Sequence, residues 1–315
     1  MRILVATDGS DAAGVGCDLA RDLATLAHGE IRIVAVVPPT MDLFGGVWPL
    51  AGVVDPQPLE RAARDKMADR LSRAVDRMPA DLRPTSALLG GRPADEIVAE
   101  ATRWPADIVV IASRGHGQLS SIVLGSVSEE VVTRSPIPVL VARQPRLRRI
   151  VVGVDGSAAS QAAVDFLTSG ATFQGLDAWV VDVAPSTDAW WLGLATADSA
   201  IFDRFIEMNE HTRLVERESA ERASQTLRDA GLVANSRHRI GDAADELVRA
   251  AAELGADTIL IGSRGPTGIG RLAIGSVARH VLRHADASVL IVHSAPVTQH
   301  AEPDDSRGVP VGASR

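Results

Sequence analysis

The 315-residue sequence is short of several residue types, and each shortage excludes a class of protein. A single cysteine, Cys17, excludes a disulfide within the chain and is typical of a reducing compartment. Because its neighbours predict a helix, we expect Cys17 to be a small buried side chain and not a nucleophile. The eight histidines and the one cysteine show no metal-ligand spacing, so we expect no zinc site.

Positive charge and long apolar runs are also scarce. The net charge is −8 and Lys66 is the only lysine, so we expect no basic stripe for a nucleic acid. No apolar run reaches the roughly 18 residues of a membrane span, and no basic stretch followed by an apolar one opens the sequence as in a signal peptide. We therefore expect a cytoplasmic protein that binds neither nucleic acid nor membrane.

What the sequence does contain is an internal repeat. Residues Ile3–Ser10 return as Ile150–Ser157, 147 positions later, and Ala106–Gly115 return as Ala256–Gly265, 150 positions later. Solenoid repeats recur every roughly 20–50 residues, so a repeat of this length is a whole domain. The sequence has thus arisen by duplication of one domain, and an inference about one half can be tested against the other.

The repeat predicts the domain organisation. We expect a first domain at 1–143 and a second at 149–294, joined by the short linker Gln144–Arg149, so that the two domains pack together. The tail, 295–315, is rich in Pro, Gly, Ser and Asp, and such a composition cannot offset the entropy lost on ordering. We expect this tail to be disordered.

Short apolar runs alternate with longer helical stretches in each half. The runs are apolar almost throughout, as in strands that are covered on both faces of a sheet. They lie at Arg2–Thr7, Ile31–Val37, Thr85–Leu89, Ile108–Ser113 and Pro138–Ala142, and again at Ile150–Val154, Ala178–Ala184, Ser236–Ile240, Thr258–Ser263 and Ser288–His293. Alternating strands and helices with short connections form right-handed βαβ units. The predicted fold class is α/β, with two tandem doubly wound, Rossmann-like domains, each a five-stranded parallel sheet flanked by helices.

A repeated glycine pattern follows the fourth expected strand of each half. Gly262-Ser263-Arg264-Gly265, nine residues and then Gly275-Ser276 correspond to Ala112-Ser113-Arg114-Gly115 and Gly125-Ser126. Glycine allows close backbone approach to a ligand and a positive φ. Each Gly-Ser pair opens an expected helix, whose free N–H groups and positive dipole end favour an anion. The serine can bind a phosphate or can cap the helix. The lysine of a P-loop is missing, which excludes a Walker-type NTPase.

An acidic residue ends the first strand of each half. Asp8 and Asp155 each stand in an Asp-Gly-Ser turn. The carboxylate can hold an Asx turn or cap the helix that follows. It can also meet a ribose hydroxyl or Mg²⁺ beside the glycine loop. The two roles are compatible, and the sequence leaves the choice open.

Together these motifs resemble the universal stress proteins in their tandem form. The resemblance rests on the Asp-Gly-Ser turns, on the turn Gly91-Arg92-Pro93-Ala94-Asp95-Glu96 and on the Gly-x2-Gly-x9-Gly-Ser loops, and it covers nearly all of the chain except the tail. It implies one adenine-nucleotide site in each repeat. ATP would lie between the end of the first strand and the glycine loop, with Mg²⁺ bound through the nucleotide.

The resemblance also assigns the site residues. Asp8 and Asp155 would approach the ribose, the phosphates or Mg²⁺, and the main chain at Val36 and Val183 would meet the adenine. The loop residues that it implies are Ala112, Gly115, Gly125, Ser126 and Ser128 in the first repeat, and Gly262, Gly265, Gly275 and Ser276 in the second. Ala112 replaces a glycine, and Pro266 removes one N–H from the second loop, so we expect two sites of unequal affinity.

Aromatic residues gather in two segments that follow the second strands, 38–58 and 185–205. Six of the chain's ten lie there: Phe44, Trp48, Trp190, Trp191, Phe202 and Phe205. They can cover the sheet edge or the nucleotide cleft, or they can offer a surface to a protein partner. The resemblance further implies that the halves pack through their final strands as an intramolecular pseudo-dimer. It leaves open whether two chains form a homodimer.

The predicted function is an ATP-binding regulatory or stress-response module and not an enzyme. Hydrolysis would need a positioned base as well as charge stabilisation. The sequence around the loops offers Arg114 and Arg264 but no convincing base, and no nucleophile-elbow pattern supports a hydrolase triad. A slow ATP hydrolase and a nucleotide-free scaffold for protein partners are the alternatives.

Overall fold

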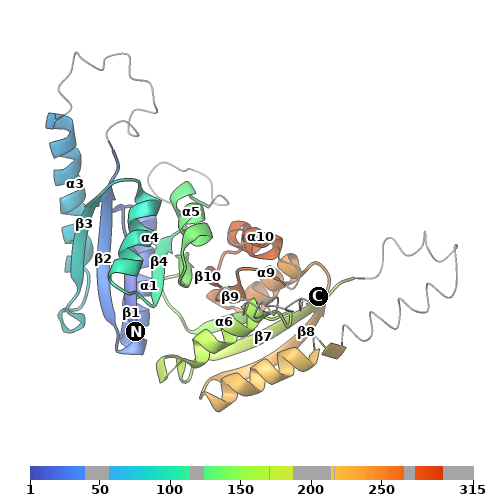
Figure 1. Ribbon diagram of the computed structural model, residues 1–315. Helices are drawn as coiled ribbons and strands as arrows, with labels where there is room; N and C mark the ends of the chain where they lie inside the picture. Colours follow the sequence, from blue (N-terminus) through green and yellow to red (C-terminus); the bar gives the residue numbers. More distant parts are fainter. Residues whose placement is uncertain are drawn as a thin grey trace, which may run out of the picture.

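A computed structural model shows how the two halves are arranged (Figure 1). It describes residues 1–39, 57–113, 124–169, 171–186, 214–215, 217–265 and 274–293. Three groups of predictions lie outside these residues: those on Gly115 and Pro266, on the six clustered aromatic residues, and on the tail.

The elements follow the predicted alternation. In the first half they are β1 (Arg2–Ala6), α1 (Asp11–Ala27), β2 (Glu30–Val37), α3 (Gln57–Asp76), β3 (Thr85–Gly90), α4 (Pro93–Arg103), β4 (Ile108–Ala112), α5 (Ser126–Arg134) and β5 (Val139–Ala142). In the second half they are β6 (Arg149–Gly153), α6 (Ala158–Thr168), β7 (Asp177–Ala184), helical residues 217–229, β8 (Val233–Ile240), α9 (Ala243–Leu254), β9 (Thr258–Gly262), α10 (Ser276–His284) and β10 (Ser288–Val292). Short 3-10 turns lie at Ala80–Leu82 and Ala171–Phe173.

All ten strands form one sheet, in the order β3-β2-β1-β4-β5-β10-β9-β6-β7-β8. Neighbouring strands within each half are parallel. At the centre β5 and β10 are antiparallel, with Leu140 opposite Leu290. The predicted α/β class is therefore confirmed, and the two five-stranded sheets join through their final strands, as the sequence resemblance implied.

Helices cover both faces of this sheet, and each face has its own core. Because successive residues of a strand point to opposite faces, Ile3 and Val5 belong to the core under α1, α3, α6 and residues 217–229, whereas Leu4 belongs to the core under α4, α5, α9 and α10. Both cores contain residues of the two halves. The halves therefore share their hydrophobic cores and form one packed unit.

Two equivalent residues strengthen the junction between the halves. Arg143, just after β5, donates hydrogen bonds to the main-chain oxygens of Leu282 and Ala287 near the end of α10. His293, just after β10, contacts the Val132 oxygen near the end of α5 at 3.0 Å through Nε2. In the repeat Arg143 corresponds to His293, and Leu282 corresponds to Val132. Each half thus contacts a main-chain oxygen near the end of a helix in the other half, as an approximate two-fold axis requires.

Candidate functional site

The strand order places a candidate site at the carboxyl ends of the strands. In the first half β1 lies between β2 and β4, with Ala6 opposite Val34 on one side and Ile111 on the other. From β1 the chain continues to β2 on one side and returns later to β4 on the other, so the strand order reverses between β1 and β4. Ligands of open α/β sheets bind at the carboxyl ends of the strands at such a point. In the second half β6 has the same place between β7 and β9.

A cavity of about 410 Å³ opens at this edge of the first half. It is lined by six of the seven residues that the sequence assigns to the first site: Asp8, Val36, Ala112, Gly125, Ser126 and Ser128. The seventh, Gly115, lies outside the described residues. Apolar side chains such as Val34, Met67 and Ile97 form much of the remaining wall. The size and the lining suit a small molecule with one apolar part and one polar part.

The turn after the first strand has the same geometry in both halves. Asp8 Oδ1 accepts the Ser10 N–H at 2.9 Å, and Asp155 Oδ1 accepts the Ser157 N–H at 3.0 Å. The glycine between each pair has a φ of +74° or +73°, a conformation that favours glycine. The Asx turn is therefore confirmed, while the serine and not the aspartate caps the following helix. A carboxylate has further lone pairs, so this turn leaves room for a ligand role.

The main chain at the end of the second strand points into the same region. The Thr7 N–H donates to the Val34 oxygen at 2.9 Å, and the Gly91 N–H donates to the Val37 oxygen at 3.1 Å on the other side of β2. Because alternate residues of a parallel strand bond to opposite neighbours, Val36 turns its N–H and C=O toward the β1 side, beyond the last residue of β1. Val183 has the same orientation, since the Val154 N–H donates to the Val181 oxygen at 3.0 Å.

The helices α5 and α10 begin at this edge, and glycine is the N-cap of each. Gly125 and Gly275 donate to the Ser113 and Ser263 oxygens at 2.8 Å, with φ of −65° and −61°. None of the four described loop glycines has a positive φ, so these positions do not use that property of glycine. A Cβ at Gly275 would lie 3.4 Å from the Ser263 oxygen, an ordinary contact, so neither φ nor packing within the chain requires this glycine.

The two loop serines stand at the first helical position of α5 and α10. Ser126 and Ser276 are exposed, and their place after the N-cap glycine excludes the capping role that the sequence left open. The first N–H groups of a helix have no partner within the helix. Each serine hydroxyl therefore stands beside free N–H groups, which is the arrangement expected of an anion site.

Two other predicted residues have structural roles. The buried Ser128 hydroxyl donates to the Ala112 oxygen at 2.8 Å, so it lines the cavity but cannot give the same proton to a phosphate. A Cβ at Gly262 would lie 2.6 Å from the backbone of Ala159 in α6, so helix packing requires this glycine. In the first half the Cβ position of Gly16 lies 3.6 Å from the Ala112 nitrogen, which is an ordinary contact distance. Ala112 is therefore accommodated without a glycine on the strand.

In the second half the acid and the loop meet directly. A Cβ at Gly265 would lie 3.1 Å from Asp155 Oδ2, and a Cβ at Gly275 would lie 3.9 Å from the Gly265 nitrogen. The structure thus brings Asp155, Gly265 and Gly275 together as the sequence predicts. A large side chain at Gly265 would fill the space beside the carboxylate.

Sequence reasoning missed the apolar wall of the first site and one charged residue, Arg70. Arg70 of α3 lines the cavity, and its Nη1 donates to the Asp8 oxygen at 3.0 Å. The contact joins residues 62 positions apart, and α3 carries no motif that would indicate it. The second half does not repeat this contact. A Cβ at Gly9 would collide with Arg70, whereas a Cβ at the equivalent Gly156 would meet Ser219 at 3.8 Å.

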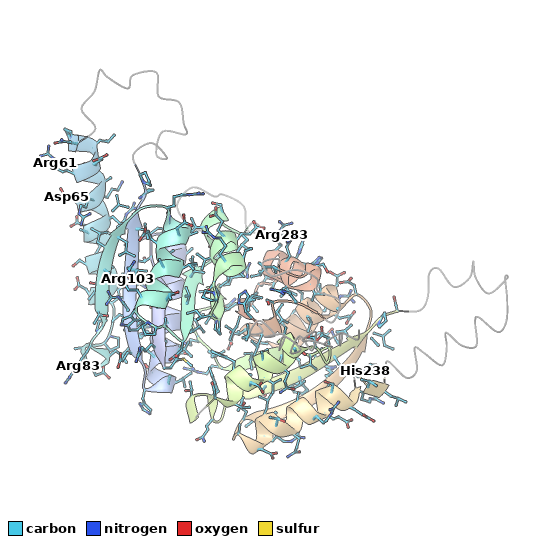
Figure 2. All side chains as sticks on the ribbon, viewed as in Figure 1. Arg61, Asp65, Arg83, Arg103, His238 and Arg283 are labelled. Carbon is cyan, nitrogen blue, oxygen red and sulfur yellow. The ribbon has the colours of Figure 1, made fainter. Side chains whose placement is uncertain are left out.

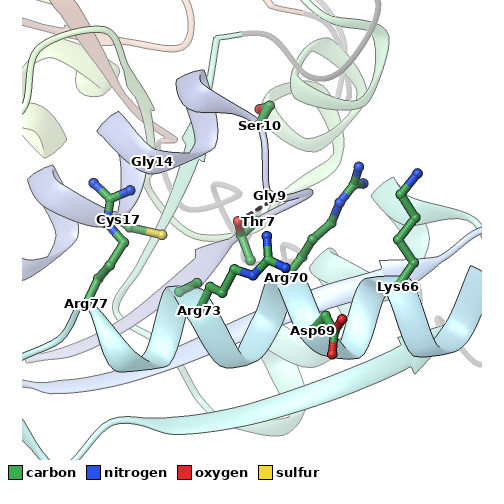
Figure 3. A pocket seen from close by; sticks show the side chains of 11 residues that line it. Thr7, Gly9, Ser10, Gly14, Cys17, Lys66, Asp69, Arg70, Arg73 and Arg77 are labelled. Carbon is green, nitrogen blue, oxygen red and sulfur yellow. Dashed lines mark hydrogen bonds between the residues drawn. The ribbon is translucent and has the colours of Figure 1, made fainter.

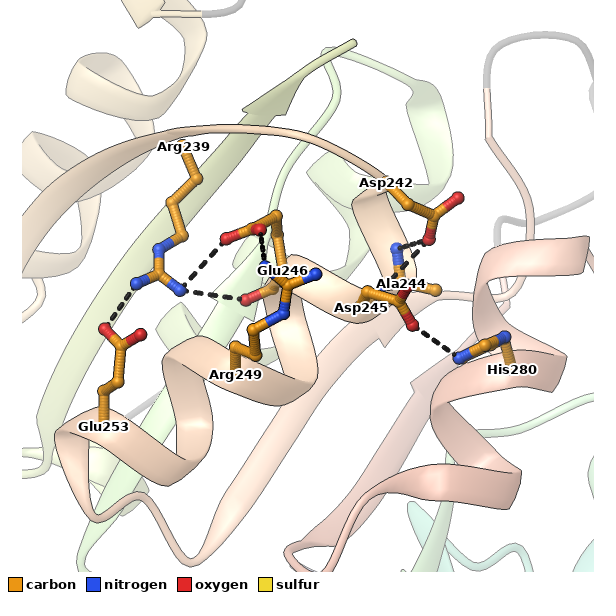
Figure 4. Close-up of polar contacts among 8 residues, drawn as sticks. All are labelled: Arg239, Asp242, Ala244, Asp245, Glu246, Arg249, Glu253 and His280. Atoms are coloured by element: carbon orange, nitrogen blue, oxygen red, sulfur yellow. Dashed lines mark hydrogen bonds and ion pairs between the residues drawn. The ribbon is translucent and has the colours of Figure 1, made fainter. Parts of the chain in front are cut away.

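Polar contacts of α9 fix the position of α10 in the second half (Figure 4). Asp242 Oδ1 accepts the N–H groups of Ala244 and Asp245 at 3.0 and 3.1 Å, and so caps α9. The Asp245 carboxylate pairs with His280 of α10 at 2.9 Å, and Glu246 pairs with Arg239 of β8 at 3.2 Å. The acidic residues of this turn therefore have a structural role.

Cys17 and the charged groups set limits on the chemistry. Cys17 is buried in α1, and burial raises the pKa of its thiol to about 11, so the thiolate is scarce at neutral pH. Within the described ranges, no group of three or more His, Cys, Asp or Glu side chains could hold a metal ion. None of the helices that the structure describes is both long and apolar enough to cross a membrane.

Comparisons with known proteins agree with this architecture. The profile of the Universal stress protein family matches residues 1–143 and 146–293. A Mycobacterium tuberculosis universal stress protein is 27% identical over 311 residues, which cover 93% of this chain and 97% of that protein. One from Thermus aquaticus is 34% identical over 141 residues, 45% of this chain and 97% of that protein.

A solved structure shows the same fold over nearly the whole length. The crystal structure of a universal stress protein from Archaeoglobus fulgidus aligns with a TM-score of 0.59 at 19% sequence identity, covering 93% of this chain and 98% of that one. Two matches to the family profile, one in each half, account for the duplicated α/β halves and the paired glycine loops. The chain therefore belongs to the universal stress protein family, with two family domains in tandem.

Proposed function

We propose that the protein is an ATP-binding regulatory module with one adenine-nucleotide site in each half. The observation that carries this proposal is the first-half cavity, where the turn after β1, the end of β2 and the beginning of α5 meet. Membership of the family supports it, because the sequence resemblance implies ATP in the same place. A regulatory effect then requires that ATP binds two conformations with different affinity.

The parts of the cavity match the parts of a nucleotide. The apolar wall of Val34, Met67 and Ile97 would cover the adenine, while the N–H and C=O of Val36 would hydrogen-bond its edge. The phosphates would lie at the beginning of α5, against the Ser126 hydroxyl and the first free N–H groups. Asp8 stands between the two regions, where the ribose would lie.

Mg²⁺ fits this site as part of the nucleotide complex. Each half offers one carboxylate, Asp8 or Asp155, and Mg²⁺ is commonly bound by one or two carboxylates together with substrate phosphates and water. Asp8 and Asp155 would hold the ion, which would neutralise phosphate charge there. The chain itself supplies the turn that holds each carboxylate in place.

Binding without rapid turnover suits the residues that line the first cavity. Among those described, the titratable ones are Asp8, whose Oδ1 is engaged in the turn, and Arg70, which is a cation and cannot act as a base. Hydrolysis needs a group that orients or deprotonates water. We therefore propose a binding protein, and a slow hydrolase is the outcome to test against it.

The test uses a pair of matched variants, Ser126→Glu and Ser276→Glu. Glutamate in the first turn of a helix favours folding, yet it places a negative charge where the phosphates would lie. Calorimetry should find two ATP molecules bound per wild-type chain, one per single variant and none in the double variant. Ser→Ala changes are the uncharged controls, which lose the hydroxyl contact but keep the free N–H groups. Two molecules bound to the double variant would contradict the proposed phosphate position.

A second measurement separates the alternative functions. The purified protein is denatured and the released nucleotide is identified. Released ATP supports the regulatory module. Released ADP together with turnover of added ATP favours a hydrolase. If no nucleotide is released and none binds at millimolar ATP, the nucleotide-free scaffold for protein partners is favoured.

A further inference from the structure

A second cavity, of about 360 Å³, lies between α1 and α3 on the other side of the β1 turn (Figure 3). One wall carries four cations, Lys66, Arg70 and Arg73 of α3 and Arg77 just after it, and we call this cavity the basic groove. Small residues of the β1 turn and of α1, such as Gly9 and Gly14, line the opposite side. The groove is distinct from the first-half cavity described above, which we call the nucleotide cleft, although Thr7 and Arg70 line both.

The four cations form one stripe along α3 and the residue that follows it. Their spacing of four, three and four residues puts them on one helical face, and Figure 3 shows their side chains extending to the same side of α3. Like charges at such spacing repel one another and destabilise a helix. The chain has a net charge of −8 and a single lysine, which is one of the four. General composition therefore does not explain the stripe.

The groove contains more positive than negative charge. Arg77 pairs with Asp18 at 3.2 Å, and Arg70 donates to the Asp8 main-chain oxygen at 3.0 Å. Lys66 and Arg73 form no ion pair within the part of the chain that the structure describes. Asp69 is the one carboxylate among the described residues that line the groove.

The second half shows that the fold does not need this stripe. Gly9 and Gly156 face Arg70 and Ser219, respectively, which aligns α3 with the helix of the second half. At the positions equivalent to the four cations, that helix carries Val215, Ser219, Arg222 and Thr226. Three of the four charges are thus absent where the backbone and the sheet are the same.

We propose that the basic groove is an anion-binding site, specific to the first half, for a compact oxyanion of the phosphate or pyrophosphate class. Guanidinium groups bind phosphate oxygens in pairs, and an ammonium adds a flexible point charge. A cavity of this size suits a small anion and not a polymer. The proposal does not depend on nucleotide binding, since Lys66 and Arg73 do not line the nucleotide cleft.

The test measures pyrophosphate binding to the full chain by calorimetry. The parent protein carries Ser126→Glu and Ser276→Glu, so that neither loop helix offers its own anion site. Into this parent we introduce Lys66→Gln with Arg73→Gln, which removes two groove charges. The matched control is Arg61→Gln with Arg64→Gln on the same helix. Figure 2 shows Arg61 on the outer side of α3, and neither arginine lines the groove.

The groove pair should weaken pyrophosphate binding about tenfold or more, and the control pair less than about twofold. Circular dichroism confirms that both pairs keep the helix content of the parent. Absence of pyrophosphate binding in the parent would overturn the proposal, and so would equal weakening by both pairs. ATP binding to the wild-type chain is measured in a separate titration. Loss of the proposed nucleotide sites would change only the ATP titration, whereas loss of the basic groove would change only the pyrophosphate titration.

Discussion

The turn that follows the first strand is the same in the two halves, but the residues packed on it differ. In the first half the Arg70 guanidinium lies over the turn and binds the Asp8 main-chain oxygen, whereas in the second half Ser219 has this place. The turn is held by its own hydrogen bonds and by a glycine at positive φ. Local bonding thus preserved the geometry after duplication, while the helix above it was free to change its chemistry.

A second difference concerns how each half makes room for the helix after β1. In the second half the strand carries Gly262, whose Cβ position lies 2.6 Å from the backbone of Ala159. In the first half the strand carries Ala112, and the Cβ position of Gly16 on its helix lies an ordinary 3.6 Å from the Ala112 nitrogen. Packing of the helix therefore requires glycine on the strand only in the second half. A glycine in a motif need not be there for the ligand.

The largest expected effect is on the second site. Gly265→Glu would place a carboxylate next to Asp155, whose Oδ2 lies 3.1 Å from the Cβ position of Gly265. Repulsion of phosphate should reduce ATP affinity at this site by roughly 100-fold or more, while the first site keeps its affinity. Calorimetry of the variant should find one bound nucleotide, and Gly265→Gln separates charge from bulk. Two bound nucleotides would show that the second loop does not hold the phosphates.

Exchange of the small residues tests the packing difference. Gly262→Ala should destabilise the protein by about 1–3 kcal/mol, because its Cβ would overlap the Ala159 backbone. Ala112→Gly should cost about 1 kcal/mol, since it adds backbone freedom and removes one buried methyl group without any overlap. Urea unfolding measures both changes. Equal costs would mean that α6 can move away and that the glycine is not required by packing.

Conversion of the first half toward the second tests the role of Arg70. Arg70→Ser removes the charge-assisted bond to the Asp8 oxygen and should weaken ATP binding at the first site about fivefold to tenfold. The second site is the internal control, and Ser219→Ala in that half should have little effect. The measurement is two-site calorimetry, and a loss at both sites would indicate a general change in stability.

The smallest effect concerns the junction of the halves. Burial lowers the pKa of His293 below 6.5, and its neutral ring can donate Nε2–H to the Val132 oxygen. The unfolded chain then binds more protons than the folded one, so stability should fall by at most about 1 kcal/mol as the pH drops below 6.5 toward the folded pKa. Thermal unfolding of wild type and His293→Gln measures it. The same loss in His293→Gln would assign the effect to other groups.

The sequence predicted the elements well because buried parallel strands are unbroken apolar runs. The largest difference is β8, which begins at Val233, three residues before the predicted Ser236. Most of this edge strand is exposed, so its polar residues hide the strand pattern that pairing with β7 imposes. The tandem arrangement could also be predicted, because the equivalent residues of the two halves recur at a nearly constant offset.

The site was predicted where local motifs define it and missed where distant elements meet. The Asp-Gly-Ser turn and the Gly-Ser helix starts are local, and the structure brings six of the assigned residues to one cavity. Arg70 reaches this cavity from a helix without a motif, and the roles of Ser128 and Gly262 depend on the strand or helix that each contacts. Those contacts are set by tertiary packing, which a pattern along one chain does not encode.

The antiparallel pairing of β5 with β10 has a consequence for how other molecules could reach the protein. Because strand direction reverses at the centre, the strands of the two halves terminate along opposite margins of the ten-stranded sheet. The beginnings of α5 and α10 therefore lie at opposite margins of the sheet. If both halves bind nucleotide as proposed, a partner protein that contacts the rim of one site would not contact the other, and each site would act on a different partner.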